Sequence, residues 1–242
     1  MAANIEAKTN VSPTLHPFNI TRIEGYEEAR GYVSHAVTAL DEAYQSVDAV
    51  HEARKKLQLD ESRTNRAKVL MTAQLAEKYS ARLQKTFESS WNKLNAAIQH
   101  TERELTQPVE EFAGIGNVAT EIRAHVKNMS QGDRMNFLSE ALKRGDQRTL
   151  KSVLGAPSYL SGMTGVEHEH FTRRYHSHQS PELSSRIEVM KATLDKLERA
   201  HPIFVKELEK AVGASRSDVE RLQAASNEAE AALVMKEFAP QE

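Results

Sequence analysis

The longest regular pattern in the chain begins at Tyr26, where apolar residues return every seven positions. One row is Tyr26, Val33, Leu40 and Val47. A second row is Ala29, Ala36, Ala43, Val50 and Leu57. Rows with this offset are the a and d positions of a heptad repeat, which predicts a long helix with an apolar seam. Arg54 interrupts the seam, and Val37 and Tyr44 widen it, so we expect this helix to contact more than one neighbour.

A second long helix is predicted over residues 62–107, after a turn near Asp60-Glu61-Ser62. Neither glycine nor proline occurs in 32–107, and Pro108 disfavours helical geometry in the residue before it. The predicted apolar stripe is Val69, Ala73, Ala76, Leu83, Phe87, Leu94, Ile98 and Leu105. Its spacing fits an eleven-residue repeat, which favours a straighter course than heptads do. Residues 25–107 are therefore predicted to form one long, coiled-coil-like antiparallel hairpin.

Residues 108–179 are predicted to form a compact region of short helices. Asn117, Ser130 and Asp146 are suited to begin helices, and Gly145 is suited to end one. Thr164 and Glu167 have the spacing of a capping box, so a further helix is expected to begin there.

The C-terminal part, 180–238, is predicted to be a second helical hairpin. Ser180-Pro181 is a typical helix start, and the apolar stripe that follows continues past Pro202, so a kinked helix and a break both remain open. Gly213 ends this helix. The last helix is expected to bury Val219, Leu222, Ala229 and Leu233. The first 24 residues contain Pro13 and Pro17, have little periodicity, and are predicted to be an extended arm. The alternative is that the apolar residues of this arm dock along a neighbour: Val11, Leu15, Phe18, Ile20 and Ile23. No segment is typical of a strand, so the predicted fold is all-α.

The composition narrows the classes of function. The formal net charge is −2, so nucleic-acid binding would require a local basic patch. The chain has no cysteine, which excludes disulfides, thiolate metal ligands and cysteine nucleophiles. The N-terminus has neither the basic start nor the apolar centre of a signal peptide, and no apolar run reaches the roughly 20 residues that span a bilayer. We expect a soluble, cytoplasmic protein without membrane contact.

Four of the ten histidines lie in HEHFTRRYHSH, residues 168–178. Two metal ligands on one helix face require a spacing of three or four residues. The gaps here are two, six and two, and the capping box predicts a helix, so we expect no metal site. Phe171 and Tyr175 should anchor this helix inward, with most of the histidines in solvent. A metal-dependent enzyme using these histidines is the third functional hypothesis.

Two further motifs suggest ligand chemistry. The stretch GIGNVA, 114–119, has the spacing of a dinucleotide-binding glycine loop, but no buried parallel strand precedes it. Residues 131–154 are predicted to form two helices around a glycine turn, which resembles a helix-turn-helix. Four basic residues accompany this segment: Lys143, Arg144, Arg148 and Lys151. A DNA-binding regulatory protein that uses this segment is therefore the second functional hypothesis.

The stretch EIRAHVKNMSQGDRMNFLSEALKRGDQRTLKSVLGAPSYLSGMT, residues 121–164, resembles a segment of uncharacterised helical proteins of tailed bacteriophages and prophages. The shared features are an I-R-x-H start, a Gly-Asp turn, and VLGAP followed by YLSG. The resemblance implies a phage setting, hence host cytoplasm or virion, and no activity or site.

The favoured function is non-catalytic. We expect a structural, assembly or adaptor protein, in a phage setting a virion or assembly component, that acts by helix packing with itself or a protein partner. No catalytic motif and no cofactor site is predicted. The residues expected to carry self-packing or partner contact are Tyr26, Val33, Leu40, Val47, Leu83, Phe87, Leu94 and Ile98.

Overall fold

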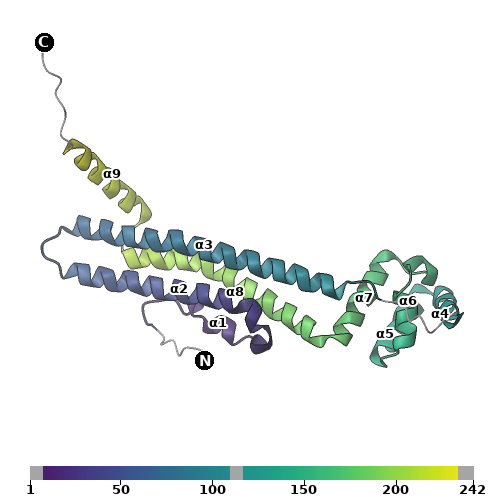
Figure 1. The fold of residues 1–242 in the computed structure, drawn as a ribbon. Helices are drawn as coiled ribbons and strands as arrows, with labels where there is room; N and C mark the ends of the chain where they lie inside the picture. The colour runs from purple at the N-terminus through teal and green to yellow at the C-terminus, as the bar shows by residue number, and fades with distance from the viewer. Residues whose placement is uncertain (1–7, 110–116, 234–242) are drawn as a thin grey trace, which may run out of the picture. The chain divides into compact units, whose positions relative to one another are not determined.

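The structure is a computed structural model that describes residues 8–109 and 117–233 (Figure 1). All regular structure within these ranges is helical. The elements in chain order are η1 (Pro13–Leu15), α1 (Phe18–Thr21), α2 (Tyr26–Gln58), α3 (Asn65–Leu105), α4 (Asn117–Lys127), α5 (Gln131–Lys143), α6 (Gln147–Leu154), η2 (Ser158–Ser161), α7 (Gly165–Gln179), α8 (Pro181–Val212) and α9 (Arg216–Ala232). The predicted all-α fold is confirmed.

Packing divides the chain into two units. The first comprises Met1–Lys93 with Ala192–Glu242, and the second comprises Leu94–Lys191. The sequence-based division instead has its breaks after residues 24, 107 and 179. The two divisions differ because sequence signals mark helix ends, whereas α3 and α8 each contribute residues to both units.

In the first unit, α2 and α3 pack together. The Arg82 guanidinium on α3 donates to the Glu42 carboxylate on α2 at 3.3 Å, and the Ser90 hydroxyl donates to the main-chain carbonyl of His35 at 3.3 Å. Residues 59–64 connect the two helices, so the turn predicted near residue 60 is confirmed. The coiled-coil character of this pair stays a prediction.

The buried face of α2 follows the predicted seam. The buried residues are Ala29, Val33, Ala36, Ala39, Leu40, Ala43, Tyr44, Ser46, Val47 and Val50. Ala39 and Ser46 extend this face beyond the a and d rows, and α2 also contacts η1 and α1. The seam fades at both ends of the helix, where Tyr26 and Leu57 are only half-buried.

The described part of the N-terminal arm is not extended. It makes two short helical turns, η1 and α1, both of which contact α2. Val11, Leu15 and Ile20 are buried. The prolines that suggested an extended arm instead lie at helix starts, where a fixed φ and a missing N–H cost nothing: Pro13 begins η1 and Pro17 directly precedes α1. The arm therefore adds to the apolar core of its own unit.

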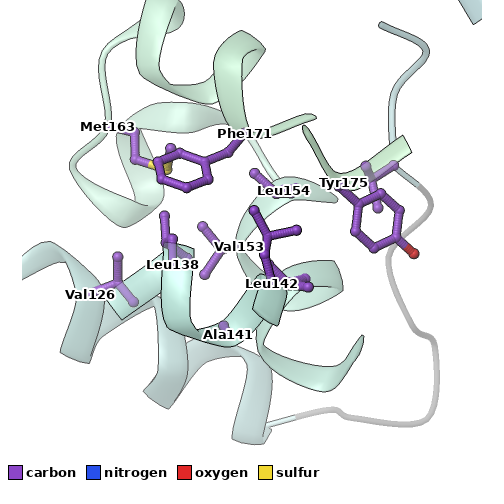
Figure 2. Close-up of a cluster of buried hydrophobic side chains, with 11 residues drawn as sticks. Val126, Leu138, Ala141, Leu142, Val153, Leu154, Met163, Phe171 and Tyr175 are labelled. Atoms are coloured by element: carbon purple, nitrogen blue, oxygen red, sulfur yellow. The ribbon is translucent and has the colours of Figure 1, made fainter. Parts of the chain in front are cut away.

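The second unit has its own apolar core, formed by α4 to α7 together with Val109 and Met163 from the segments between helices (Figure 2). The buried residues are Val109, Val126, Leu138, Ala141, Leu142, Leu150, Val153, Leu154, Met163, Phe171 and Tyr175. Helix α6 contacts α4, α5, α7 and η2, so it is the central element of this unit.

The helix starts in the second unit confirm three predicted caps. The Ser130 hydroxyl accepts from the Asp133 N–H at the start of α5, and the Asp146 carboxylate accepts from the Thr149 N–H at the start of α6. Thr164 and Glu167 form the complete capping box of α7. Asn117 is the first residue of α4 rather than the residue before it. The glycines of the GIGNVA motif, at 114 and 116, lie outside the described residues.

For the C-terminal part, one open question is answered and one prediction is corrected. Helix α8 continues through Pro202. The prediction that α9 buries its apolar face is wrong, because Val219 and Leu222 are half-buried while Ala229 and Leu233 are exposed. The apolar spacing in α9 is real, but no other described element covers its second half.

Candidate functional site

The residues predicted to contact a partner are already covered within the single chain. All are buried except Tyr26, which is half-buried at the start of α2. The buried residues are Val33, Leu40, Val47, Leu83, Phe87, Leu94 and Ile98. Their apolar area contributes to the stability of the fold, so a partner would have to bind elsewhere on the surface.

Helix α9 has an apolar stripe that is half-buried at its start and exposed at its end. Val219, Leu222, Ala229 and Leu233 repeat at helical spacing, and none of them is buried. The Ser215 hydroxyl accepts from the Asp218 N–H and fixes the start of the helix. Gly213, with φ of 72°, separates α8 from α9, because this left-handed conformation suits glycine at a helix end. The stripe is the feature best suited to helix packing with another chain.

A hollow of about 440 Å³ lies at the start of this stripe. Apolar residues from α3 and α8 line it together with Val219: Ala73, Ala76, Val205, Leu208 and Val212. The carboxylates of Glu77, Glu209 and Glu220 lie at its margin. The apolar surface of α9 is therefore continuous with an apolar hollow on the same unit.

Helix α7, which contains the histidine cluster, is anchored as predicted. Phe171 is fully buried and Tyr175 is 6% exposed. The Tyr175 hydroxyl donates to the Gln147 side-chain oxygen at 2.9 Å, and burial raises the pKa of this phenol. Thr172 is also buried, which the sequence analysis did not anticipate.

The four histidines of α7 have separate environments. His170 and His178 are exposed, whereas His168 and His176 are half-buried. The His176 Nε2 lies 2.8 Å from the main-chain carbonyl oxygen of Gln107, so this ring ties α7 to the end of α3 within the second unit. The prediction that most of the cluster is in solvent therefore holds for only two of the four rings.

Neither a metal cluster nor a membrane span is found among the described residues. No group of three or more histidine, aspartate or glutamate side chains in 8–109 and 117–233 is placed to hold a metal ion. None of the helices in these ranges is long and apolar enough to cross a membrane.

The four basic residues of the α5–α6 hairpin differ in how far they are exposed to solvent. Lys143 and Arg144 are exposed, and the Lys143 ammonium lies 2.7 Å from the Glu140 carboxylate. Arg148 is exposed and Lys151 is half-buried. Five of the eight residues of α6 are buried: Thr149, Leu150, Ser152, Val153 and Leu154. A recognition helix must leave a broad face free to enter the major groove of DNA. Because most of α6 is buried, this helix has no such broad free face.

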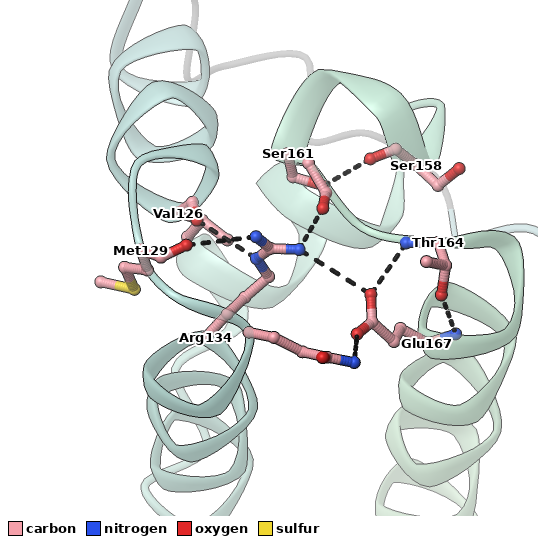
Figure 3. A network of polar contacts seen from close by, with 9 residues as sticks. Val126, Met129, Arg134, Ser158, Ser161, Thr164 and Glu167 are labelled. Carbon is pink, nitrogen blue, oxygen red and sulfur yellow. Dashed lines mark hydrogen bonds and ion pairs between the residues drawn. The ribbon is translucent and has the colours of Figure 1, made fainter.

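A buried polar network joins α4, α5, η2 and α7 (Figure 3). The Arg134 guanidinium donates to the carbonyls of Val126 at 3.3 Å and Met129 at 3.2 Å, and also to the carbonyl of Gly162. The Glu167 carboxylate lies 3.8 Å from the same guanidinium. One side chain therefore donates to carbonyls at the ends of α4 and η2, where helix carbonyls lack some of their usual intrahelical partners.

The Glu167 carboxylate has several donors of its own. It accepts from the Thr164 N–H at 2.8 Å and from the Gln131 amide at 2.7 Å. The Thr164 N–H is the largest cause of a lowered pKa for Glu167, and Gln131 and Arg134 lower it further. The network is structural, because its hydrogen bonds connect the ends of neighbouring helices.

Sequence reasoning identified Glu167 as a cap and did not identify Arg134 as its partner. A signal exists, because Arg134 falls at a position of α5 that is four residues before Leu138 and therefore on its buried face. An arginine on an apolar helix face is usually paired, since a buried charge requires a partner.

Searches with protein-family models, with curated proteins and with solved structures found no match to this chain.

Proposed function

We propose that this chain is a non-catalytic structural, assembly or adaptor protein that acts by helix packing, with itself or with a partner. The partly exposed stripe of α9 is the observation that supports the proposal. An amphipathic helix normally hides its apolar face, and a helix of 17 residues gains most of its stability from such packing.

The charges of α9 are compatible with a second copy as the packing partner. Arg216 lies near the beginning of the helix, where its guanidinium pairs with Glu220 at 3.0 Å, and Glu228 and Glu230 lie near its end. Two α9 helices side by side in opposite directions would bring Arg216 of each copy toward the acidic end of the other. The apolar stripes would then cover each other.

Light scattering on matched variants tests the proposal. Leu222→Asp with Leu233→Asp introduces two charges into the stripe, and we expect it to lower the mass in solution. Ala224→Asp with Ala231→Asp introduces the same charges on the opposite, exposed face and should leave the mass unchanged. Circular dichroism checks that both variants keep their helices. A wild-type monomer at high micromolar concentration would contradict assembly and leave the adaptor role alone.

The resemblance of residues 121–164 to tailed-phage proteins supports assembly of a phage particle as the setting. No observation on α6 favours the DNA-binding hypothesis, since most of that helix is buried.

A further inference from the structure

A shallow groove of about 470 Å³ lies between α3 and α8 in the first unit. Helix α3 contributes four residues that share one face, because they are three or four positions apart: Gln84, Phe87, Glu88 and Trp91. Helix α8 contributes Leu197, Glu198 and His201. None of these residues belongs to α9 or to the hollow beside it.

The groove has an apolar floor and an aromatic wall. Phe87 and Leu197 form the floor and are almost fully buried. The Phe87 ring meets the His201 ring edge-on at 5.5 Å, which holds both rings in place. Trp91 remains 44% exposed, although it is the largest side chain in the groove. Exposed tryptophans beside an apolar floor are typical of the residues that dominate binding energy at protein interfaces.

The indole of Trp91 is fixed by a carboxylate from the other helix. Its Nε1 donates to Glu198 Oε1 at 2.9 Å. A carboxylate has about four acceptor sites, so this bond leaves Glu198 able to accept more. Glu88 is a second exposed carboxylate in the lining. In addition, Pro202 has no N–H to donate to the main-chain carbonyl of Glu198 four residues earlier.

The charges of the residues that line the groove favour a positively charged ligand. Glu88 and Glu198 are acidic, and no lysine or arginine from the described part of the chain lines the groove. Carboxylate or phosphate ligands would be repelled, whereas a cation is attracted both by the carboxylates and by the face of the indole ring. The acceptors also outnumber the donors, which favours a ligand with several N–H groups.

We infer that this groove binds an arginine side chain presented by a partner protein. A planar guanidinium can stack on Trp91 and donate at the same time to Glu88 and Glu198, which the compact ammonium of lysine does less well. The aliphatic part of the arginine covers Phe87 and Leu197. The groove and the α9 stripe have no residue in common, so this inference does not depend on self-assembly through α9.

Trp91 itself reports binding, because it is the only tryptophan in the chain. The indole N–H resonance of the full-length protein is followed by NMR while N-acetyl-arginine amide is added. N-acetyl-citrulline amide is the matched probe, since it has nearly the same shape and no charge. We expect a saturable shift with the arginine compound and an affinity at least about tenfold lower for the citrulline compound. Equal responses to the two compounds, or no response to either, would overturn the inference.

Two carboxylate variants test whether the arginine compound binds in this groove. Glu88→Gln with Glu198→Gln removes both charges but keeps an amide oxygen to accept from the indole, so the Trp91 ring should stay in place. We expect the arginine affinity to fall about tenfold or more. Glu28→Gln removes one exposed charge on α2, outside the groove, and should bind like the wild type. If the double variant binds arginine as well as Glu28→Gln does, the groove is not the site. The α9 variants should keep the full response, whatever their mass.

Discussion

The Arg134 guanidinium and the Glu167 carboxylate lie 3.8 Å apart, and each side chain is only 10% exposed. The pair links α5 to α7 within the second unit (Figure 3). Arg134 is the more consequential partner, because it also satisfies carbonyls of Val126, Met129 and Gly162. The pair therefore organises helix ends from four elements around one cation.

Replacing Arg134 with methionine should destabilise the protein by about 3–5 kcal/mol, because the buried Glu167 carboxylate would lose its cation and three carbonyls would each lose a donor. Arg134→Lys should recover only a minor part of this loss, since an ammonium cannot reach all of these acceptors in one plane. Urea unfolding of both variants measures the difference. Equal stability of Arg134→Met and the wild type would show that the network adds nothing to folding.

The lowered pKa of Glu167 predicts a pH dependence with a definite sign. A carboxyl whose pKa is lower in the folded state stabilises the protein above its unfolded pKa, and the benefit is lost as the pH falls through the folded pKa. The wild type should therefore lose stability below about pH 4.5, and Glu167→Gln should lose less over the same range. Thermal melting of both proteins from pH 7 to pH 3 checks this. If the melting temperatures of the two proteins fell in parallel with pH, Glu167 would not contribute to the pH dependence of stability.

Gly145 should tolerate substitution less well than the basic residues beside it. Its φ of 65° lies in the left-handed region, although a Cβ there would meet nothing within 4 Å, so backbone strain alone is at issue. Gly145→Val should cost about 1–2 kcal/mol or more. Changing Lys143, Arg144, Arg148 and Lys151 together to alanine should cost less. Chemical unfolding ranks the two variants, and the reverse order would mean that the charges hold the hairpin together.

The side chain of Phe171 should contribute more to the stability of the protein than the histidines around it. Phe171→Ala should cost about 3–5 kcal/mol, because the ring is fully buried in the core of the second unit (Figure 2). Replacing His168, His170, His176 and His178 together with glutamine should have a small effect at pH 7.5, since an amide can replace the contact of His176 with the Gln107 carbonyl. Melting with equimolar zinc and with a chelator completes the test. A zinc-dependent rise in the wild type alone would reveal a metal site between chains.

A charge in the buried seam of α2 should be costly. Leu40 is fully buried, and Leu40→Asp should destabilise the protein by about 3–5 kcal/mol. Thr38→Asp, two residues earlier on the exposed face, is the matched control and should change stability little. Differential scanning calorimetry compares the two. Similar melting temperatures would mean that α2 and α3 separate before the rest of the protein unfolds.

The sequence determined the helices and most of their ends, because these depend on local chemistry. The heptad rows predicted the face of α2 that is buried from Ala29 to Val50. Side-chain oxygens and a left-handed glycine marked the starts and stops around α5, α6 and α7, since the partners of a cap lie within four residues of it.

Tertiary structure decided which apolar faces are covered and which polar groups meet. The stripe of α9 has the same periodicity as a buried face, yet no described element lies over its second half. Trp91 meets Glu198 from 107 residues away, and Arg134 meets Glu167 from 33 residues away. Periodicity shows that a helix has an apolar face but not what packs against it. The pairing of distant charges depends on how helices are arranged, and a single sequence carries no local signal for that arrangement.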